Sequence, residues 1–209
     1  MRREYFSTSL RFPVVKWIIL LNILVFFFWR IAGRDGFIFM ENNFLVSWQS
    51  CVEGRVWTIL TSVFSHNMFL HIFVNMYVFF GFGMVMENLL GPFKFLKFYL
   101  LAGITSSLSH SVVSAWIMGE PELPALGASG AISGVVMCYC LLFPKRKILL
   151  LGIIPIPAIM GIFLVVGLDL WGLFAQARGG GLPIGHGAHL GGALYGALYY
   201  FFFLKKVRI

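Results

Sequence analysis

The most constraining feature of this sequence is the recurrence of long stretches without a charged residue. A membrane-spanning helix needs about 20 mostly apolar residues, and five uncharged segments reach that length. They cover residues 67–86, 98–119, 123–144, 148–168 and 179–204. A sixth, 12–33, is interrupted only by Lys16 and Arg30 near its ends, where long basic side chains reach the interface. With 59% hydrophobic and 11% charged residues, the 209-residue chain has more apolar surface than one water-soluble core hides.

These stretches predict an all-α membrane protein, a six-transmembrane-helix bundle that forms a single domain over residues 1–209. The spans are expected at about 12–33, 67–88, 96–117, 127–144, 148–172 and 186–204. The stretch 34–68 between the first two spans is too long for a simple turn, so we expect an external region with structure of its own. The glycine-rich segment 176–187 and the fifth helix are expected to gate access.

Basic residues set the expected orientation, because loops rich in Lys and Arg stay on the cytoplasmic side. With six alternating spans, 12 of the 16 Lys and Arg residues fall on one side: Arg2, Arg3, Arg11, Lys16, Lys94, Lys97, Lys145, Arg146, Lys147, Lys205, Lys206 and Arg208. Both termini are therefore expected in the cytoplasm. The short chain fits a bacterial inner membrane, with an organelle membrane as the alternative. Topology accounts for the net charge of +8, so no nucleic-acid partner is inferred.

The segment Gly127-Ala128-Ser129-Gly130 opens the fourth expected span at its external end. Glycines beside a serine let other backbone approach and leave the hydroxyl unshielded. A helix N-terminus also offers free N–H groups, which suit a developing oxyanion. Gly130 and Gly134 form a small-xxx-small pattern that permits close helix packing in lipid. Ser129 is therefore a candidate nucleophile, although this pattern on its own is common as plain packing.

The sixth expected span carries a histidine on a glycine face at its external end. His189, Gly192 and Gly196 follow an i, i+3, i+7 spacing, so the imidazole shares one helix face with two glycines. If the fourth and sixth helices meet through their glycine faces, Ser129 and His189 lie at matching depth. A serine–histidine hydrogen bond then becomes geometrically possible.

A third polar site opens the second expected span. His71 and Asn75 lie at i and i+4 on one helix face, at the same external end as the other two sites. Such donors suit an oxyanion hole. Plain packing residues have no reason to gather polar groups at the same depth on three helices, so the coincidence favours a catalytic site.

The polar residues of this chain allow two other interpretations. A zinc site is the other chemical interpretation of the histidines His66, His71, His186 and His189. It lacks the His-Glu-x-x-His pattern and an obvious carboxylate base, so no metal is inferred. The second interpretation is a channel or transporter, because the third expected span has a polar face made of Ser106, Ser107, Ser109, His110, Ser111 and Ser114. We expect that face to be buried within the bundle.

In combination, these motifs resemble the rhomboid intramembrane serine proteases: Gly-Ala-Ser-Gly at 127–130, Ala-His-x-x-Gly-x-x-x-Gly at 188–196 and His-x-x-x-Asn at 71–75. The resemblance implies a rhomboid-like bundle with an external L1 region. It implies that Ser129 is the nucleophile and His189 the general base of a dyad, with His71, Asn75 and the Ser129 amide at the oxyanion. It further implies transmembrane segments of other proteins as substrates and no cofactor. Glu87 looks like the family's helix-tethering glutamate.

Two positions depart from the family pattern, and one carboxylate needs a role. Trp57 is followed by Thr58 rather than arginine, and Ser133 stands where many members have an aromatic residue. Asp169 in the fifth span is a possible third member of a triad; we expect a structural, hydrogen-bonded carboxylate instead. The alternative to a protease is a catalytically silent rhomboid-like protein that binds transmembrane clients. The serine and histidine that such a protein would lack are both present.

Overall fold

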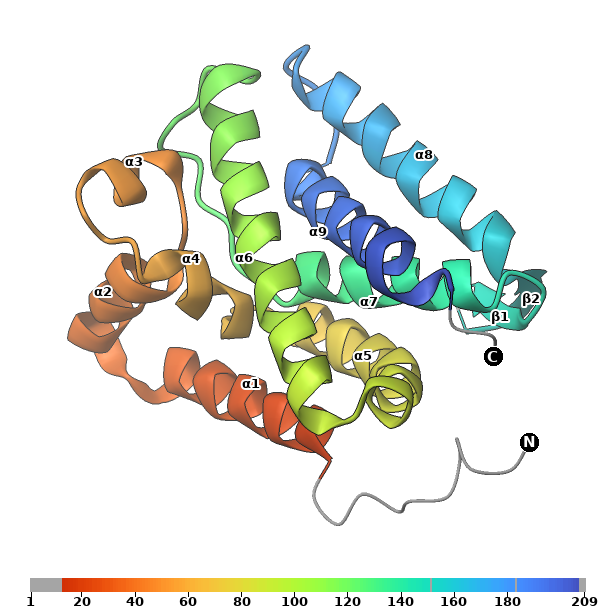
Figure 1. The fold of residues 1–209 in the computed structure, drawn as a ribbon. Coiled ribbons are helices and arrows are strands. Elements are labelled where there is room, and N and C mark those ends of the chain that lie inside the picture. Colours follow the sequence, from red (N-terminus) through yellow and green to blue (C-terminus); the bar gives the residue numbers. More distant parts are fainter. Residues whose placement is uncertain (1–12, 151, 183, 207–209) are drawn as a thin grey trace.

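The computed structural model describes residues 13–150, 152–182 and 184–206, with Leu150 described by its backbone only. The first position of the first expected span, residue 12, lies outside these ranges. The same holds for four of the basic residues behind the expected orientation: Arg2, Arg3, Arg11 and Arg208. The described part of the chain is mostly helical, and Figure 1 shows a bundle of long helices with shorter ones at one side.

Six long helices form the bundle: α1 (Val14–Ile31), α5 (Phe69–Leu90), α6 (Pro92–Trp116), α7 (Ser129–Leu142), α8 (Ala158–Gln176) and α9 (His186–Tyr199), which continues as the π-helix η2 (Tyr200–Leu204). Among the described residues, α1, α5 and α8 are long and apolar enough to cross a membrane, while α7 is apolar but shorter. Helix α7 runs through the middle of the bundle and contacts α5, α6, α8 and α9 (Figure 1).

The region between α1 and α5 has helices of its own: α2 (Gly33–Phe44), α3 (Trp48–Val52), α4 (Thr58–Thr61) and the 3-10 turn η1 (Ser62–Phe64). Thr58, at the position that departs from the family pattern, is fully buried, and its hydroxyl donates to the Arg55 carbonyl at 2.7 Å. Arg55 itself donates to the Asn42 side chain at 3.1 Å and pairs with Glu53. Contacts within the region therefore take part in holding it, together with the packing of α3 and α4 on α6.

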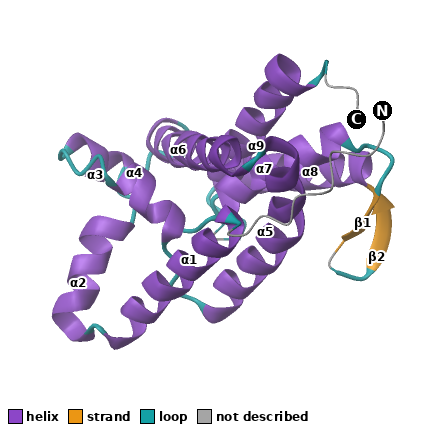
Figure 2. Cartoon of the chain, turned by 60° about the horizontal axis from the view of Figure 1, so that its bottom comes forward, coloured by secondary structure: helices purple, strands orange, loops and turns teal. Residues whose placement is uncertain are grey.

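The fifth expected span begins ten residues too early. Its first part is a β-hairpin instead, with β1 (Lys147–Leu150) antiparallel to β2 (Ile154–Pro157), at one edge of the bundle in Figure 2. Helix α8 starts only at Ala158, directly after Pro157. Pro155 and Pro157 lack an N–H and cost about 3 kcal/mol each in a helix interior, which explains the later start.

A buried carboxylate joins the start of α1 to α5. Glu87 has no exposed surface and accepts the backbone N–H groups of Val14 and Val15 at 2.6 and 2.9 Å. These are N–H groups of the first helical turn, which have no acceptor within the helix, and the positive end of the helix dipole favours the negative charge. Glu87 therefore connects the two helices as a tether.

The polar face of α6 lies inside the bundle, as expected. Five of its six polar residues are buried: Ser106, Ser107, His110, Ser111 and Ser114. Ser109, the sixth, donates to the Gly187 carbonyl at 2.8 Å, which ties α6 to α9. These groups serve helix packing in this structure, and this removes the argument for a channel.

Candidate active site

Ser129 and His189 lie within hydrogen-bond distance of each other. Ser129 is the first residue of α7 and His189 lies in the first turn of α9, and their Oγ and Nε2 atoms are 2.9 Å apart. Both residues are partly exposed. Because Ser129 opens its helix, its own backbone N–H has no acceptor within α7. A hydroxyl, an imidazole and a free N–H therefore meet at one point.

This meeting depends on close contact between glycines of α7 and α9. A Cβ atom on Gly192 would lie 1.8 Å from the carbonyl oxygen of Gly130, and one on Gly196 would lie 2.2 Å from that of Gly134. No side chain fits at either place. The condition that these helices meet through their glycine faces is therefore met, and the contact brings Ser129 and His189 within hydrogen-bond distance.

Asp169 on α8 contacts the other side of the His189 ring. Its Oδ1 lies 3.0 Å from Nδ1 of His189 and 2.8 Å from Nδ1 of His186. A carboxylate only accepts, so both Nδ1 atoms donate, and Nε2 of His189 is left to accept the Ser129 hydroxyl proton. Asp169 is hydrogen-bonded, as expected, but its contact with His189 is the one that the disfavoured triad alternative requires and that a dyad of Ser129 and His189 does not include. His186 was not expected to take part in this cluster. The sequence signal that could have pointed to it is its i, i+3 spacing to His189 on one helix face.

His71 and Asn75 lie on α5, and among the described residues the structure brings the His71 ring, but no recorded contact of Asn75, to the segment just before Ser129. A Cβ atom on Gly127, two residues before the serine, would lie 2.7 Å from Cε1 of His71 and 3.0 Å from its Nε2. The Asn75 amide donates to the His71 carbonyl at 2.8 Å. Gly127 has a φ of +121°, which disfavours any side chain, so glycine permits both this backbone turn and the approach of His71.

The loop before Ser129 is fixed by residues that precede α5. The N–H of Gly127 donates to the Ser62 carbonyl at 2.9 Å, and that of Ala128 to Nε2 of His66 at 3.3 Å. Burial, with a smaller effect from His71, lowers the pKa of His66 to about 3. The ring is therefore neutral, which Nε2 needs in order to accept. Sequence reasoning considered His66 only as a zinc ligand and missed this role.

Ser133, the second departure from the family pattern, turns back onto its own helix. Its hydroxyl donates to the Ser129 carbonyl at 2.9 Å. It therefore does not fill the place of an aromatic side chain next to His189. The ring of His189 is held by its two hydrogen bonds, to Asp169 and Ser129.

The four histidines of the zinc hypothesis divide into two pairs. His66 and His71 stack edge to face with ring centroids 4.8 Å apart, while His186 and His189 share Asp169. In the described part of the chain, one group of possible metal ligands stands out: the ligand atoms of Asp169, His186 and His189 lie within 4.8 Å of one another. Hydrogen bonds to Asp169 already account for that spacing.

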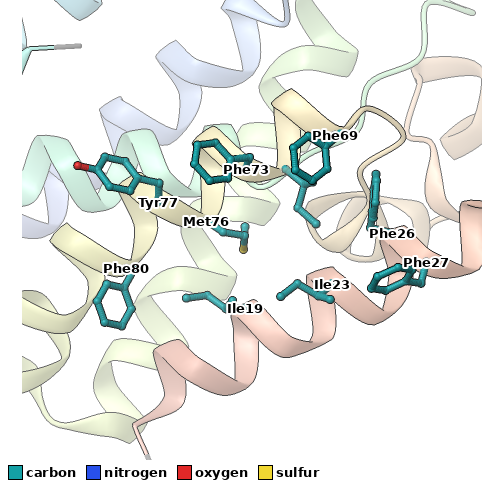
Figure 3. Close-up of a pocket in the computed structure, with 10 residues that line it drawn as sticks. Ile19, Ile23, Phe26, Phe27, Phe69, Phe73, Met76, Tyr77 and Phe80 are labelled. Carbon is teal, nitrogen blue, oxygen red and sulfur yellow. The ribbon is translucent and has the colours of Figure 1, made fainter. Parts of the chain in front are cut away.

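A separate hollow lies away from these residues, between α1 and α5. Its volume is about 530 Å³, and Figure 3 shows side chains of both helices around it. Its lining is apolar apart from the Tyr77 hydroxyl, with several aromatic rings, among them Phe26, Phe73 and Phe80. Ser129, His189, His71 and Asn75 do not line it, so it plays no part in the candidate chemistry.

Comparison with known proteins decides the family. The model of the Rhomboid domain matches residues 53–206. The chain belongs to the rhomboid family. It is 33% identical to "RHOMBOID-like protein 12, mitochondrial" of Arabidopsis thaliana over 88% of this chain and 56% of that protein. Identity to "Rhomboid protein 1, mitochondrial" of Saccharomyces cerevisiae is 30%, over 90% of this chain and 52% of that protein.

A third rhomboid relative, "Presenilin-associated rhomboid-like protein A, mitochondrial" of Danio rerio, is 35% identical over 88% of this chain and 46% of that protein. The chain thus spans about half the length of these relatives. All three are named as mitochondrial. The expected bacterial inner membrane is therefore wrong, since the rhomboid relatives point to an organellar membrane. The assignment of the termini to a bacterial cytoplasm falls with it.

Proposed function

We propose that this rhomboid-family chain is an intramembrane serine endopeptidase that cuts transmembrane segments of other membrane proteins. One observation carries the proposal: the 2.9 Å contact between Oγ of Ser129 and Nε2 of His189. Its family includes intramembrane serine proteases. In this proposal Ser129 is the nucleophile and His189 the general base.

The proposed reaction proceeds through an acyl-enzyme. Nε2 of His189 takes the hydroxyl proton of Ser129 while Oγ attacks the peptide carbonyl carbon. The Ser129 N–H, His71 and Asn75 stabilise the resulting oxyanion. His189 then gives its proton to the leaving amine, and water, activated by the same ring, hydrolyses the ester. Asp169 accepts a hydrogen bond from the Nδ1–H of His189 throughout, which keeps the proton on Nδ1 and leaves Nε2 available as the base.

The proposed membrane arrangement uses all six long helices as spans, in a single rhomboid domain over residues 1–209. The stretch 34–68 then forms the external L1 region, on the side where Ser129 and His189 lie. Support comes from the basic residues Lys94, Lys145 and Lys205, which follow the other ends of α5, α7 and α9. We place the domain in an organellar membrane. Water reaches the dyad from the external side.

The test is cleavage of a single-span model substrate by purified protein in detergent and in liposomes. We expect cleavage by the wild type and none by Ser129→Ala or His189→Ala. Ser114→Ala is the matched control, because the hydroxyl of this buried α6 serine donates to its own helix, at the Ser111 carbonyl. Equal cleavage by wild type and Ser129→Ala would refute the nucleophile. Absence of cleavage, with a bound client that copurifies equally with wild type and Ser129→Ala, would favour a silent client-binding protein.

A further inference from the structure

His186 has no part in the proposed reaction, yet it bonds to the same carboxylate oxygen as His189, which does. It is the first residue of α9, three positions before His189, and is buried. Its Nδ1 lies 2.8 Å from Oδ1 of Asp169, the same oxygen that receives Nδ1 of His189 at 3.0 Å. One carboxylate oxygen therefore accepts two imidazole N–H groups, and only one of these imidazoles reaches Ser129.

We propose that His186 is a positioning residue: its Nδ1–H holds the Asp169 carboxylate in the rotamer that orients His189 toward Ser129. This inference rests on the proposed protease function. His186 acts through Asp169 and does not touch the reacting atoms.

The donor count supports this role. The side chain of Asp169 is about nine-tenths buried, and its recorded hydrogen bonds are those from the two histidines. The carboxyl group turns about the Cβ–Cγ bond with a broad preference, so one donor leaves its orientation loosely defined. Two donors on one oxygen, both from the same face of α9, define it. A buried carboxylate that lost one of them would also carry a desolvation cost that drives it to rearrange.

The backbone of α8 holds the His186 ring in place. Gly172 lies three residues after Asp169, on the same face of α8. A Cβ atom at Gly172 would lie 2.1 Å from Nε2 of His186 and 2.3 Å from its Cε1. The far edge of the ring thus occupies the space that glycine leaves free. This contact directs Nδ1 toward Asp169 and keeps Nε2 away from it.

Two amide substitutions test the position of the donor. Asn carries its amide nitrogen near the place of Nδ1, whereas Gln carries it one bond further, near the place of Nε2. We expect His186→Gln to lower kcat about tenfold to a hundredfold with KM nearly unchanged, because the base is displaced. His186→Asn should restore most of the kcat. If His186→Gln and His186→Asn have the same kcat as each other, whether lowered or at the wild-type value, the proposal is overturned.

A readout independent of proteolysis separates this inference from the proposed function. Histidine-selective ¹⁵N NMR of the Ser129→Ala protein reports the Nδ1–H of His189 directly. We expect that signal to move in His186→Gln and to stay near its original position in His186→Asn. The same result is expected even if the wild type cleaves nothing, whereas an unmoved signal in both variants would sink the positioning role. Thermal unfolding of each variant identifies any loss that comes from misfolding.

Discussion

Oδ1 of Asp169 lies 3.0 Å from Nδ1 of His189, whose other nitrogen lies 2.9 Å from the hydroxyl of Ser129. Three helices supply these three side chains: α7 the hydroxyl, α9 the imidazole and α8 the carboxylate. The order hydroxyl, imidazole, carboxylate is that of a serine-protease triad, which places the negative charge beside the ring that must become positive. The catalytic hypothesis therefore includes Asp169.

Asp169→Asn should lower kcat by about 10²–10⁴ if the carboxylate orients and stabilises the base. The amide keeps an oxygen acceptor but loses the charge. Its size is unchanged, so packing is preserved. Initial rates on the single-span substrate give kcat and KM, and Glu120→Gln, an exposed acid in the loop before α7, is the control. A kcat equal to that of wild type would return Asp169 to a purely structural role.

His71→Ala combined with Asn75→Ala should lower kcat by about 10²–10³, since loss of an oxyanion donor usually has that cost. KM should change little because the donors act on the transition state. The matched control is Val74→Ala on the exposed face of the same helix. Wild-type turnover in the double variant would leave the Ser129 N–H to stabilise the oxyanion without these side chains.

Gly192→Ala should destabilise the protein by about 1–3 kcal/mol, the usual cost of overpacking. The new methyl group would collide with the carbonyl oxygen of Gly130, only 1.8 Å away. Gly81→Ala is the control, because a Cβ atom at this helical glycine meets nothing within 4 Å. Thermal unfolding in detergent compares the two. Equal midpoints would mean that α7 and α9 separate without cost.

Glu87→Ala should lower the stability by about 1.5–3 kcal/mol, the range for hydrogen bonds that involve a charged group. It would leave the N–H groups of Val14 and Val15 without their acceptor. Glu87→Gln should cost less, because its amide oxygen still accepts one of them. Unfolding measurements that rank glutamine at or below alanine would contradict the tether.

The long helices could be predicted because apolar length is the main requirement for a spanning helix. The hairpin could not be predicted in this way. Residues from Ile148 onward are as apolar as a span, and an apolar run without periodicity does not distinguish strand from helix. Pro155 and Pro157 were the available signal that a helix does not start before Ala158.

In the candidate site, the approach of Ser129 to His189 was predictable because glycine faces report directly which helices come close. The partners of Asp169 were not. They depend on how α8 is rotated about its own axis, and an apolar helix whose polar residues are Asp169 and, at its last position, Gln176 does not define that rotation. The spacing of His186 and His189 placed both rings on one side of α9, but nothing in the sequence placed α8 opposite them.

Helix α8 carries Asp169 and is also the helix expected to gate access. It packs on α7, α9 and the hairpin, and Asp169 is its link to both histidines. If α8 swings outward to admit a substrate, the carboxylate leaves with it and His189 loses the partner that fixes its tautomer. Ser129 then lacks an oriented base while α8 is displaced, and it regains that base only when α8 returns. Substrate entry and attack by Ser129 would then be separate steps, and the contact of Oδ1 of Asp169 with His189 would set their order.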